Sequence, residues 1–117
     1  ADPNAGGGDE PGDGGETASF ENWNYTMSLD TSSGLLTMQD SNGHTVTANL
    51  YCKYGLGIGT YYINDTDGVF YATDLTVNGE AVANPEGTIA LDNYYYITLD
   101  MTLDGVKYTG KSANALF

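Results

Sequence analysis

Tyrosine is the residue whose spacing in this sequence points most clearly to binding chemistry. Tyr51 and Tyr62 each alternate with residues suited to a core, and Tyr94 and Tyr96 do the same at the start of a long run of β-forming residues. Because successive side chains of a strand point to opposite faces, all four tyrosines are expected on the outer face of a sheet. Exposed aromatic rings backed by Asp and Asn are typical of surfaces that bind sugars, so these four residues are the predicted ligand-binding site. The alternative is that cross-strand tyrosine pairs only stabilise the sheet, by roughly 0.2–1 kcal/mol each.

Groups suited to catalysis are scarce. His44 is the one histidine, and it directly follows an Asn-Gly turn, where a solvated side chain with no nucleophile beside it is expected. A pair of carboxylates is the one hydrolytic arrangement that so acidic a chain leaves open. The sequence therefore predicts a protein that is not an enzyme, and no loop with the features of a nucleotide site indicates a cofactor.

Metal ligands are also poorly placed. Cys52 is the one cysteine, which excludes an internal disulfide and a cysteine-based zinc site, and a lone cysteine in an apolar stretch is usually a small buried side chain. Residues 65–68, Asp-Thr-Asp-Gly, match part of a calcium loop, but Ile63 stands where an EF-hand would need its first ligand. A hairpin turn explains the same residues, so no metal site is predicted.

The charge of the chain limits its partners. Sixteen Asp and Glu residues stand against three lysines and no arginine, which gives a formal net charge of −13. Nucleic acids and anionic membranes are bound chiefly through Lys and Arg, so neither is an expected partner. No run approaches the roughly 20 apolar residues of a transmembrane helix, so we expect no membrane insertion by the protein chain itself.

The composition changes sharply near residue 20. Residues 1–19 are rich in Gly, Pro and acids and contain no aromatic residue and no aliphatic residue larger than Ala. Nothing in this segment can offset the entropy of ordering it, so it is predicted to be a disordered, acidic, Gly-rich leader or tether. Residues 20–117 are predicted to form a single β domain, because about a hundred residues suffice for one core.

Within residues 20–117 the hydrophobic period is two, which indicates strands with one face on a core. The dipeptides Asn42-Gly43, Asn78-Gly79 and Asp104-Gly105 predict tight hairpins, and residues 94–103 are the longest expected strand. No stretch has the spacing of an amphipathic helix. The predicted fold class is all-β, either an antiparallel β-sandwich or a short up-and-down β-barrel of about 8–10 strands.

Several segments carry a resemblance to a known group of proteins. The stretches LLTMQDSNGHTVTANLY, GIGTYYI, EGTIAL and YYYITLDMTLDGVKYTGK, behind an acidic Gly-rich leader, resemble the small all-β cell-envelope lipoprotein domains of Bacteroidetes-type bacteria. In those proteins the leader follows a lipidated cysteine, and some of the domains are similar to lipocalin-like or calycin-like barrels. The resemblance implies an exported domain in the periplasm or at the cell surface. The modified cysteine is absent here, so the implied lipid anchor would lie upstream of Ala1.

The predicted function is that of a non-enzymatic, exported or surface-tethered binding domain that recognises a glycan or another small ligand. The alternative is a structural or assembly component of the cell envelope or of an extracellular polymer, which would pair with an envelope protein or another subunit through an edge strand. Residues 112–117 end on Leu116-Phe117 without a charged residue to protect such an edge. A lipocalin-like carrier is a third candidate, and it would need an interior cavity.

Overall fold

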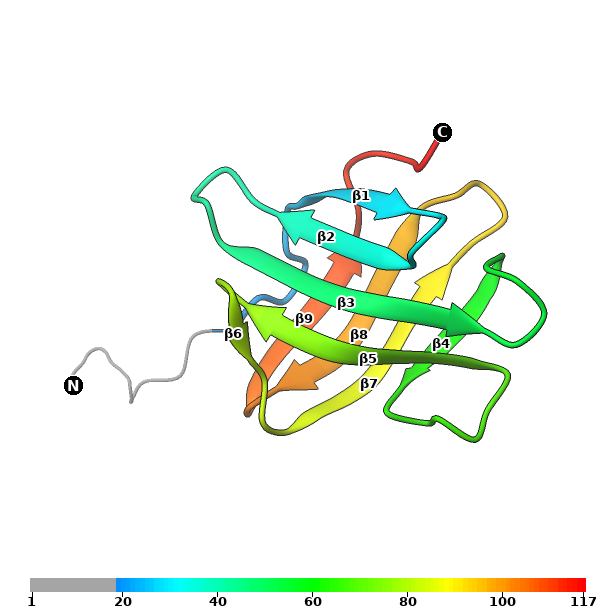
Figure 1. Ribbon diagram of the computed structural model, residues 1–117. Helices are drawn as coiled ribbons and strands as arrows, with labels where there is room; N and C mark the ends of the chain where they lie inside the picture. Colours follow the sequence, from blue (N-terminus) through cyan, green and yellow to red (C-terminus); the bar gives the residue numbers. More distant parts are fainter. Residues whose placement is uncertain (1–18) are drawn as a thin grey trace, which may run out of the picture.

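The computed structural model describes residues 19–117 (Figure 1). Residues 1–18, which make up nearly all of the predicted leader, lie outside the described part. Residues 19–117 contain nine strands and no helix, and the strands are β1 (Thr26–Asp30), β2 (Leu35–Gln39), β3 (Thr45–Cys52), β4 (Gly59–Ile63), β5 (Phe70–Val77), β6 (Glu80–Ala81), β7 (Pro85–Leu91), β8 (Ile97–Leu103) and β9 (Val106–Lys111). The predicted all-β class is confirmed.

The strands form one curled sheet in the order β1-β2-β3-β5-β4-β7-β8-β9, with β6 paired to β5. In Figure 1, β1, β2, β3 and β5 lie in front of β7, β8 and β9, so the sheet folds back on itself as a half-barrel. The order departs from an up-and-down arrangement at one place, because β5 inserts between β3 and β4 and pairs with β4 in parallel. The Gly-rich connection after Cys52 carries the chain past the position that β5 later fills.

The inner face of the curled sheet forms the core. Inward residues alternate with outward ones along each long strand, as the period of two predicts, and strand β8 reads buried-exposed from Ile97 to Asp100. The interior also holds the whole side chains of Tyr25, Tyr61 and Tyr108. These rings occupy space that a lipocalin-like carrier would need for its ligand, so the filled interior counts against a carrier.

The segment directly before β1 joins the two ends of the sheet. The backbone N–H of Phe20 donates to the carbonyl of Lys107 at 2.8 Å, and the N–H of Thr109 donates to the carbonyl of Phe20 at 3.1 Å. Further along, Trp23 N–H donates to the carbonyl of Thr109 at 2.8 Å. Residues 20–23 therefore lie parallel to β9 and then lead directly into β1.

The last segment of the chain covers the open edge of β1. Ala113 N–H donates to the carbonyl of Tyr25 at 2.8 Å. The side chain of Asn114 then acts like a neighbouring strand, since its Oδ1 accepts from Met27 N–H at 2.8 Å and its Nδ2 donates to the Met27 carbonyl at 2.9 Å. Ala113 and Asn114 thus bind the edge at β1, whereas Ser112 N–H donates to the carbonyl of Ile97 and Leu116 N–H to the carbonyl of Tyr95.

The strand predicted over residues 94–103 begins later, at Ile97. The Oδ1 of Asp92 accepts hydrogen bonds from the backbone N–H groups of Tyr94 at 2.9 Å and Tyr96 at 3.0 Å, and Tyr95 between them has a φ of 66°. A side-chain carboxylate that binds two nearby N–H groups offers the backbone an alternative to strand pairing. The first three residues of the expected strand therefore form a turn.

Gly110→Ala should destabilise the domain by about 2–4 kcal/mol, because Gly110 has a φ of 127° and a Cβ there would lie 2.9 Å from Trp23 N and 3.0 Å from Trp23 O. Both atoms belong to the backbone that links the sheet ends, so neither can move aside freely. Urea unfolding measures the change. Gly105→Ala is the control, since Gly105 also has a positive φ but a Cβ there would meet no atom within 4 Å, and it should cost only about 1–2 kcal/mol. Equal losses in the two variants would contradict close packing of Trp23 on β9.

Candidate functional site

Two of the four predicted tyrosines are brought together on the outer face of the sheet. Tyr51 on β3 is 47% exposed and Tyr62 on β4 is 51% exposed. Tyr71 on β5 lies between them and is directly paired with both. The three residues form a row across three neighbouring strands, which we call the tyrosine surface.

Tyr71 was missed in the sequence-based prediction. Its alternation with Phe70 and Ala72 was the available signal that it points outward. Its position between Tyr51 and Tyr62 depends on the insertion of β5 between β3 and β4, which no local pattern indicates. The rings of Tyr51 and Tyr71 pack against each other with centroids 4.7 Å apart and planes inclined by 31°, so this pair also stabilises the sheet.

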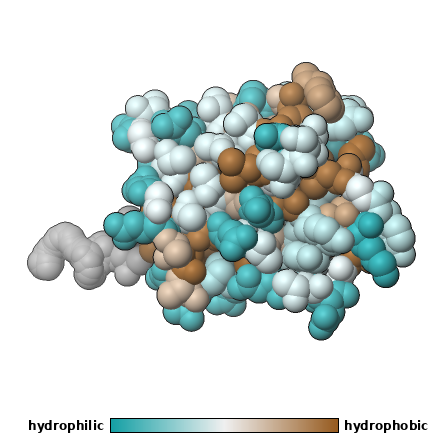
Figure 2. All heavy atoms as spheres, viewed as in Figure 1, coloured by the Kyte–Doolittle hydropathy of each residue, from teal (hydrophilic) through white to brown (hydrophobic). Residues whose placement is uncertain are grey.

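Polar side chains surround the tyrosine surface. Thr88 of β7 pairs with Tyr62, and Asp100 of β8 pairs with Thr88 in turn. One step along β3 and β5 on the same face, Asn49 lies opposite Thr73. Figure 2 shows hydrophilic and intermediate residues over most of the face in view, with hydrophobic residues in smaller areas. Half-exposed aromatic rings thus stand beside hydroxyl, amide and carboxylate groups.

The other two predicted tyrosines lie on the turn between β7 and β8. Tyr94 is 77% exposed. Tyr96 is half-buried, and the Nζ of Lys111 lies 4.5 Å from the centre of its ring. The structure therefore places Tyr94 and Tyr96 on a turn beyond the strand ends and not in the row that contains Tyr51 and Tyr62.

The prediction that His44 is solvated is wrong. Its ring is half-buried and stacks on Phe20 with centroids 4.3 Å apart, while Phe20 also stacks on Tyr108 at 4.7 Å. His44 Nε2 lies 2.7 Å from the hydroxyl oxygen of Tyr108. Trp23 packs edge-on against all three rings. We call Phe20, Trp23, His44 and Tyr108 the ring cluster.

The loop between β2 and β3 explains the position of His44. A two-residue type I′ turn needs a positive φ at both Asn42 and Gly43, but of these two only Gly43 has one, at 82°. Five residues, 40–44, instead separate β2 from β3, and Asp40 N–H donates to the carbonyl of His44 at 3.1 Å, which leaves residues 41–43 at the tip. Asp40 Oδ1 accepts from the backbone N–H groups of Asn42 at 2.9 Å and His44 at 3.0 Å. His44 therefore lies directly before β3 and not at the tip of the hairpin.

The Asp40 carboxylate is also bound to the ring cluster. Its Oδ2 accepts from Trp23 Nε1 at 2.8 Å, and this hydrogen bond does most to hold the pKa of Asp40 below its usual value. The backbone N–H groups of His44 and Asn42 lower that pKa further. Burial raises the pKa of Tyr108 to about 12, and the Asp40 charge adds to this shift, so the hydroxyl keeps its proton at neutral pH.

Metal-binding groups and membrane-spanning helices are two further features that residues 19–117 can be searched for. Among residues 19–117 no three His, Cys, Asp or Glu side chains are grouped to hold a metal ion. Residues 65–68 form a turn, closed by a hydrogen bond of 2.9 Å from Gly68 N–H to the carbonyl of Asp65. The same part of the chain contains no helix with the length and hydrophobicity needed to span a bilayer.

Comparison with known proteins gives no match: no family model, curated protein or solved structure matches this chain. The site is therefore interpreted from its own geometry.

Asp40→Asn should make the domain less stable at pH 7 and less sensitive to acid. Because the pKa of Asp40 is lowered in the folded state, its ionised form stabilises the fold above about pH 4, and this contribution is lost as the pH falls through the lowered pKa. Asparagine replaces one acceptor oxygen by a donor, so Trp23 Nε1–H or the backbone N–H groups lose their acceptor. Urea unfolding between pH 7 and pH 2, followed by the fluorescence of Trp23, measures both effects.

Asp67→Asn is the matched control. Asp67 is exposed in the turn of residues 65–68, and the substitution removes the same charge without touching the ring cluster. If the two variants lose stability at low pH in the same way, the Asp40 carboxylate does not stabilise the fold through Trp23 and the loop backbone.

Proposed function

We propose that this domain binds a carbohydrate on its outer face, at the tyrosine surface. The observation that carries the proposal is the row of Tyr51, Tyr71 and Tyr62 across three neighbouring strands, with the first and last residues about half exposed. Sugar rings present apolar C–H faces that pack on aromatic rings, and their hydroxyl groups need the polar partners that surround this row. A single aliphatic patch would not offer both.

The ligand in this proposal is a neutral glycan. The chain has a formal net charge of −13. Asp100 lies in the same cross-strand row as Tyr62 and Thr88, and its Oδ1 is paired with Lys107 Nζ at 3.0 Å, so the repulsion of an anion rests on the net charge of the chain. A sugar with carboxylate or sulfate groups would be repelled by this charge. A neutral sugar avoids the repulsion and can donate hydroxyl hydrogen bonds to the carboxylate.

The proposal extends to the setting in which the domain works. We infer a non-enzymatic domain that holds its ligand without changing it, outside the cytoplasm, in the periplasm or at the cell surface. This part rests on the resemblance of its segments to Bacteroidetes-type lipoprotein domains, in which a lipid anchor upstream holds the domain at the envelope.

Assembly through an edge strand has less support. Residues 20–23 pair with β9, and Ala113 and Asn114 bind the edge of β1. The first part of β7 pairs on one side only, but it begins with Pro85 and Glu86, which are residue types that protect sheet edges.

A glycan array probed with the full chain tests the proposal. We expect binding to at least one neutral glycan, and Tyr62→Ala should weaken it about tenfold, because loss of one aromatic stacking partner costs about 1.4 kcal/mol. Isothermal titration calorimetry with the glycan found on the array measures the change.

Tyr94→Ala is the matched control, since Tyr94 is an exposed tyrosine outside the row. It should bind as tightly as the unchanged protein. Absence of binding to every neutral glycan would overturn the proposed function, and weakening by Tyr94→Ala instead of Tyr62→Ala would move the site to the turn between β7 and β8.

A further inference from the structure

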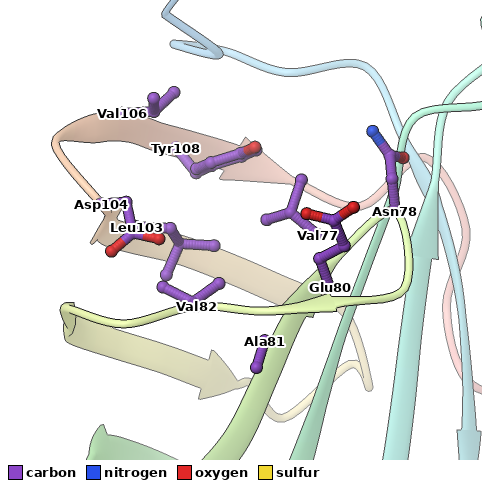
Figure 3. Close-up of a pocket in the computed structure, with 9 residues that line it drawn as sticks. All are labelled: Val77, Asn78, Glu80, Ala81, Val82, Leu103, Asp104, Val106 and Tyr108. Atoms are coloured by element: carbon purple, nitrogen blue, oxygen red, sulfur yellow. The ribbon is translucent and has the colours of Figure 1, made fainter.

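A groove of about 380 Å³ lies between the β5–β6 hairpin and the β8–β9 hairpin (Figure 3). Its apolar lining comes from Val77 and Val82 on one side and from Leu103 and Val106 on the other. Leu103 belongs to the buried core, and the three valines pack against that core while remaining partly accessible. The groove is therefore accessible apolar surface of a size that suits a short aliphatic chain.

Polar groups lie at both ends of the groove. The carboxylate of Asp104, beside Leu103, accepts from the backbone N–H groups of Ala83 at 3.2 Å and Asn84 at 2.7 Å.

Three other polar residues gather at the opposite end. Figure 3 shows the hydroxyl of Tyr108 directed toward the side on which Asn78 and the carboxylate of Glu80 lie. Tyr108 is only 2% exposed. Glu80 is exposed, and neither of the ion pairs found in residues 19–117 includes it.

A chain of hydrogen bonds determines whether the Tyr108 hydroxyl donates to His44 or accepts from it. Asn78 Oδ1 accepts from Thr45 N–H at 2.9 Å, which fixes the amide so that its Nδ2 lies 3.4 Å from His44 Nδ1. With an N–H2 group facing it, His44 Nδ1 is assigned as the acceptor, and the ring proton is on Nε2. His44 Nε2–H then donates to the hydroxyl oxygen of Tyr108, 2.7 Å away.

This arrangement leaves the proton of the Tyr108 hydroxyl without an acceptor. His44 Nε2 is the one hydrogen-bond partner found for that hydroxyl among residues 19–117. In the tautomer assigned to His44, Nε2–H donates to the hydroxyl oxygen and leaves the hydroxyl proton unused. A buried donor that lacks an acceptor is costly, so a ligand that supplies an acceptor there gains affinity.

At this end of the groove the Tyr108 hydroxyl and the second N–H of Asn78 are donors, and the Glu80 carboxylate is an acceptor. The Tyr108 hydroxyl requires an acceptor from the ligand, and the Glu80 carboxylate requires a donor. A carboxamide supplies both, because its C=O accepts and its N–H2 donates. An ammonium group can only donate, while a carboxylate can only accept and is repelled by Glu80.

We propose that this groove binds a neutral aliphatic ligand that ends in a carboxamide. The alkyl chain lies on Val77, Val82 and Leu103, the carbonyl accepts from the Tyr108 hydroxyl, and the amide N–H donates to Glu80. The site belongs to the mouth of the half-barrel and is separate from the tyrosine surface on its outer face, so it does not depend on carbohydrate binding.

Amide-detected NMR titration of the full chain with hexanamide, hexylammonium and hexanoate tests the proposal. Hexanamide should bind with a millimolar Kd and shift the resonances of residues 77–82 and 103–108 in a saturable way. In about 0.5 M NaCl, which screens the attraction of the acidic surface for a cation, hexylammonium should bind at least fivefold more weakly and hexanoate not measurably. Equal binding of hexanoate and hexanamide, or no saturable shift with hexanamide up to 50 mM, would overturn the proposal.

Tyr108→Phe removes the proposed donor and should weaken hexanamide at least fivefold. Its matched control is Tyr61→Phe, since Tyr61 is an equally buried tyrosine whose hydroxyl bonds to Gly57 and does not line this groove. Should either variant fail to fold, Glu80→Ala against Glu86→Ala gives the same comparison with two exposed glutamates, and only Glu80→Ala should weaken hexanamide. Unchanged binding in Tyr108→Phe or in Glu80→Ala would also overturn the proposal.

Discussion

The shape of this domain depends on the backbone hydrogen bonds that join the two ends of its curled sheet. A half-barrel leaves two edges with unpaired N–H and C=O groups, and here residues 20–23 bind one edge while Ala113 and Asn114 bind the other. The hydroxyl of Tyr25 adds a link across the interior, since it donates toward the carbonyls of Ile97 and Gly110 at 3.1 and 3.0 Å. The ring cluster follows from the same contacts, because pairing with β9 places Phe20 and Trp23 beside Tyr108.

The local sequence pattern predicted strands and hairpin turns well where backbone pairing alone determines the structure. The alternation of residues identified the strands, and Asn78 and Asp104 have the positive φ values, 51° and 50°, that their hairpins require. Two of the local errors share one cause. At Asp40 and at Asp92 a carboxylate accepts two nearby backbone N–H groups, which lengthened a predicted two-residue turn in one case and delayed a strand in the other.

The candidate site was predictable only in part. The alternation of residues along a strand shows which face of the sheet a side chain lies on, but not which residues lie beside it on the next strand. The outward direction of Tyr51 and Tyr62 followed from parity, whereas their joint pairing with Tyr71 needs the strand order. The end of the groove that contains Tyr108 could not be predicted from the sequence, because it also depends on which strands become neighbours. His44 and Tyr108 are 64 residues apart in the sequence, and neither has a local pattern that indicates the other.

The contacts between residues 20–27 and residues 107–114 also bear on the kinetics of folding. They join positions separated by almost the whole length of the domain, so their formation requires closure of a very long loop. Proteins rich in such non-local pairings fold in milliseconds to seconds, far more slowly than helical bundles. During synthesis, which begins at the N-terminus, β1 can pair with β2 early, but its outer edge and residues 20–23 stay unpaired until residues 107–114 have emerged. Over that interval the unpaired edge of β1 is the part of the molecule at which another chain could pair as an extra strand.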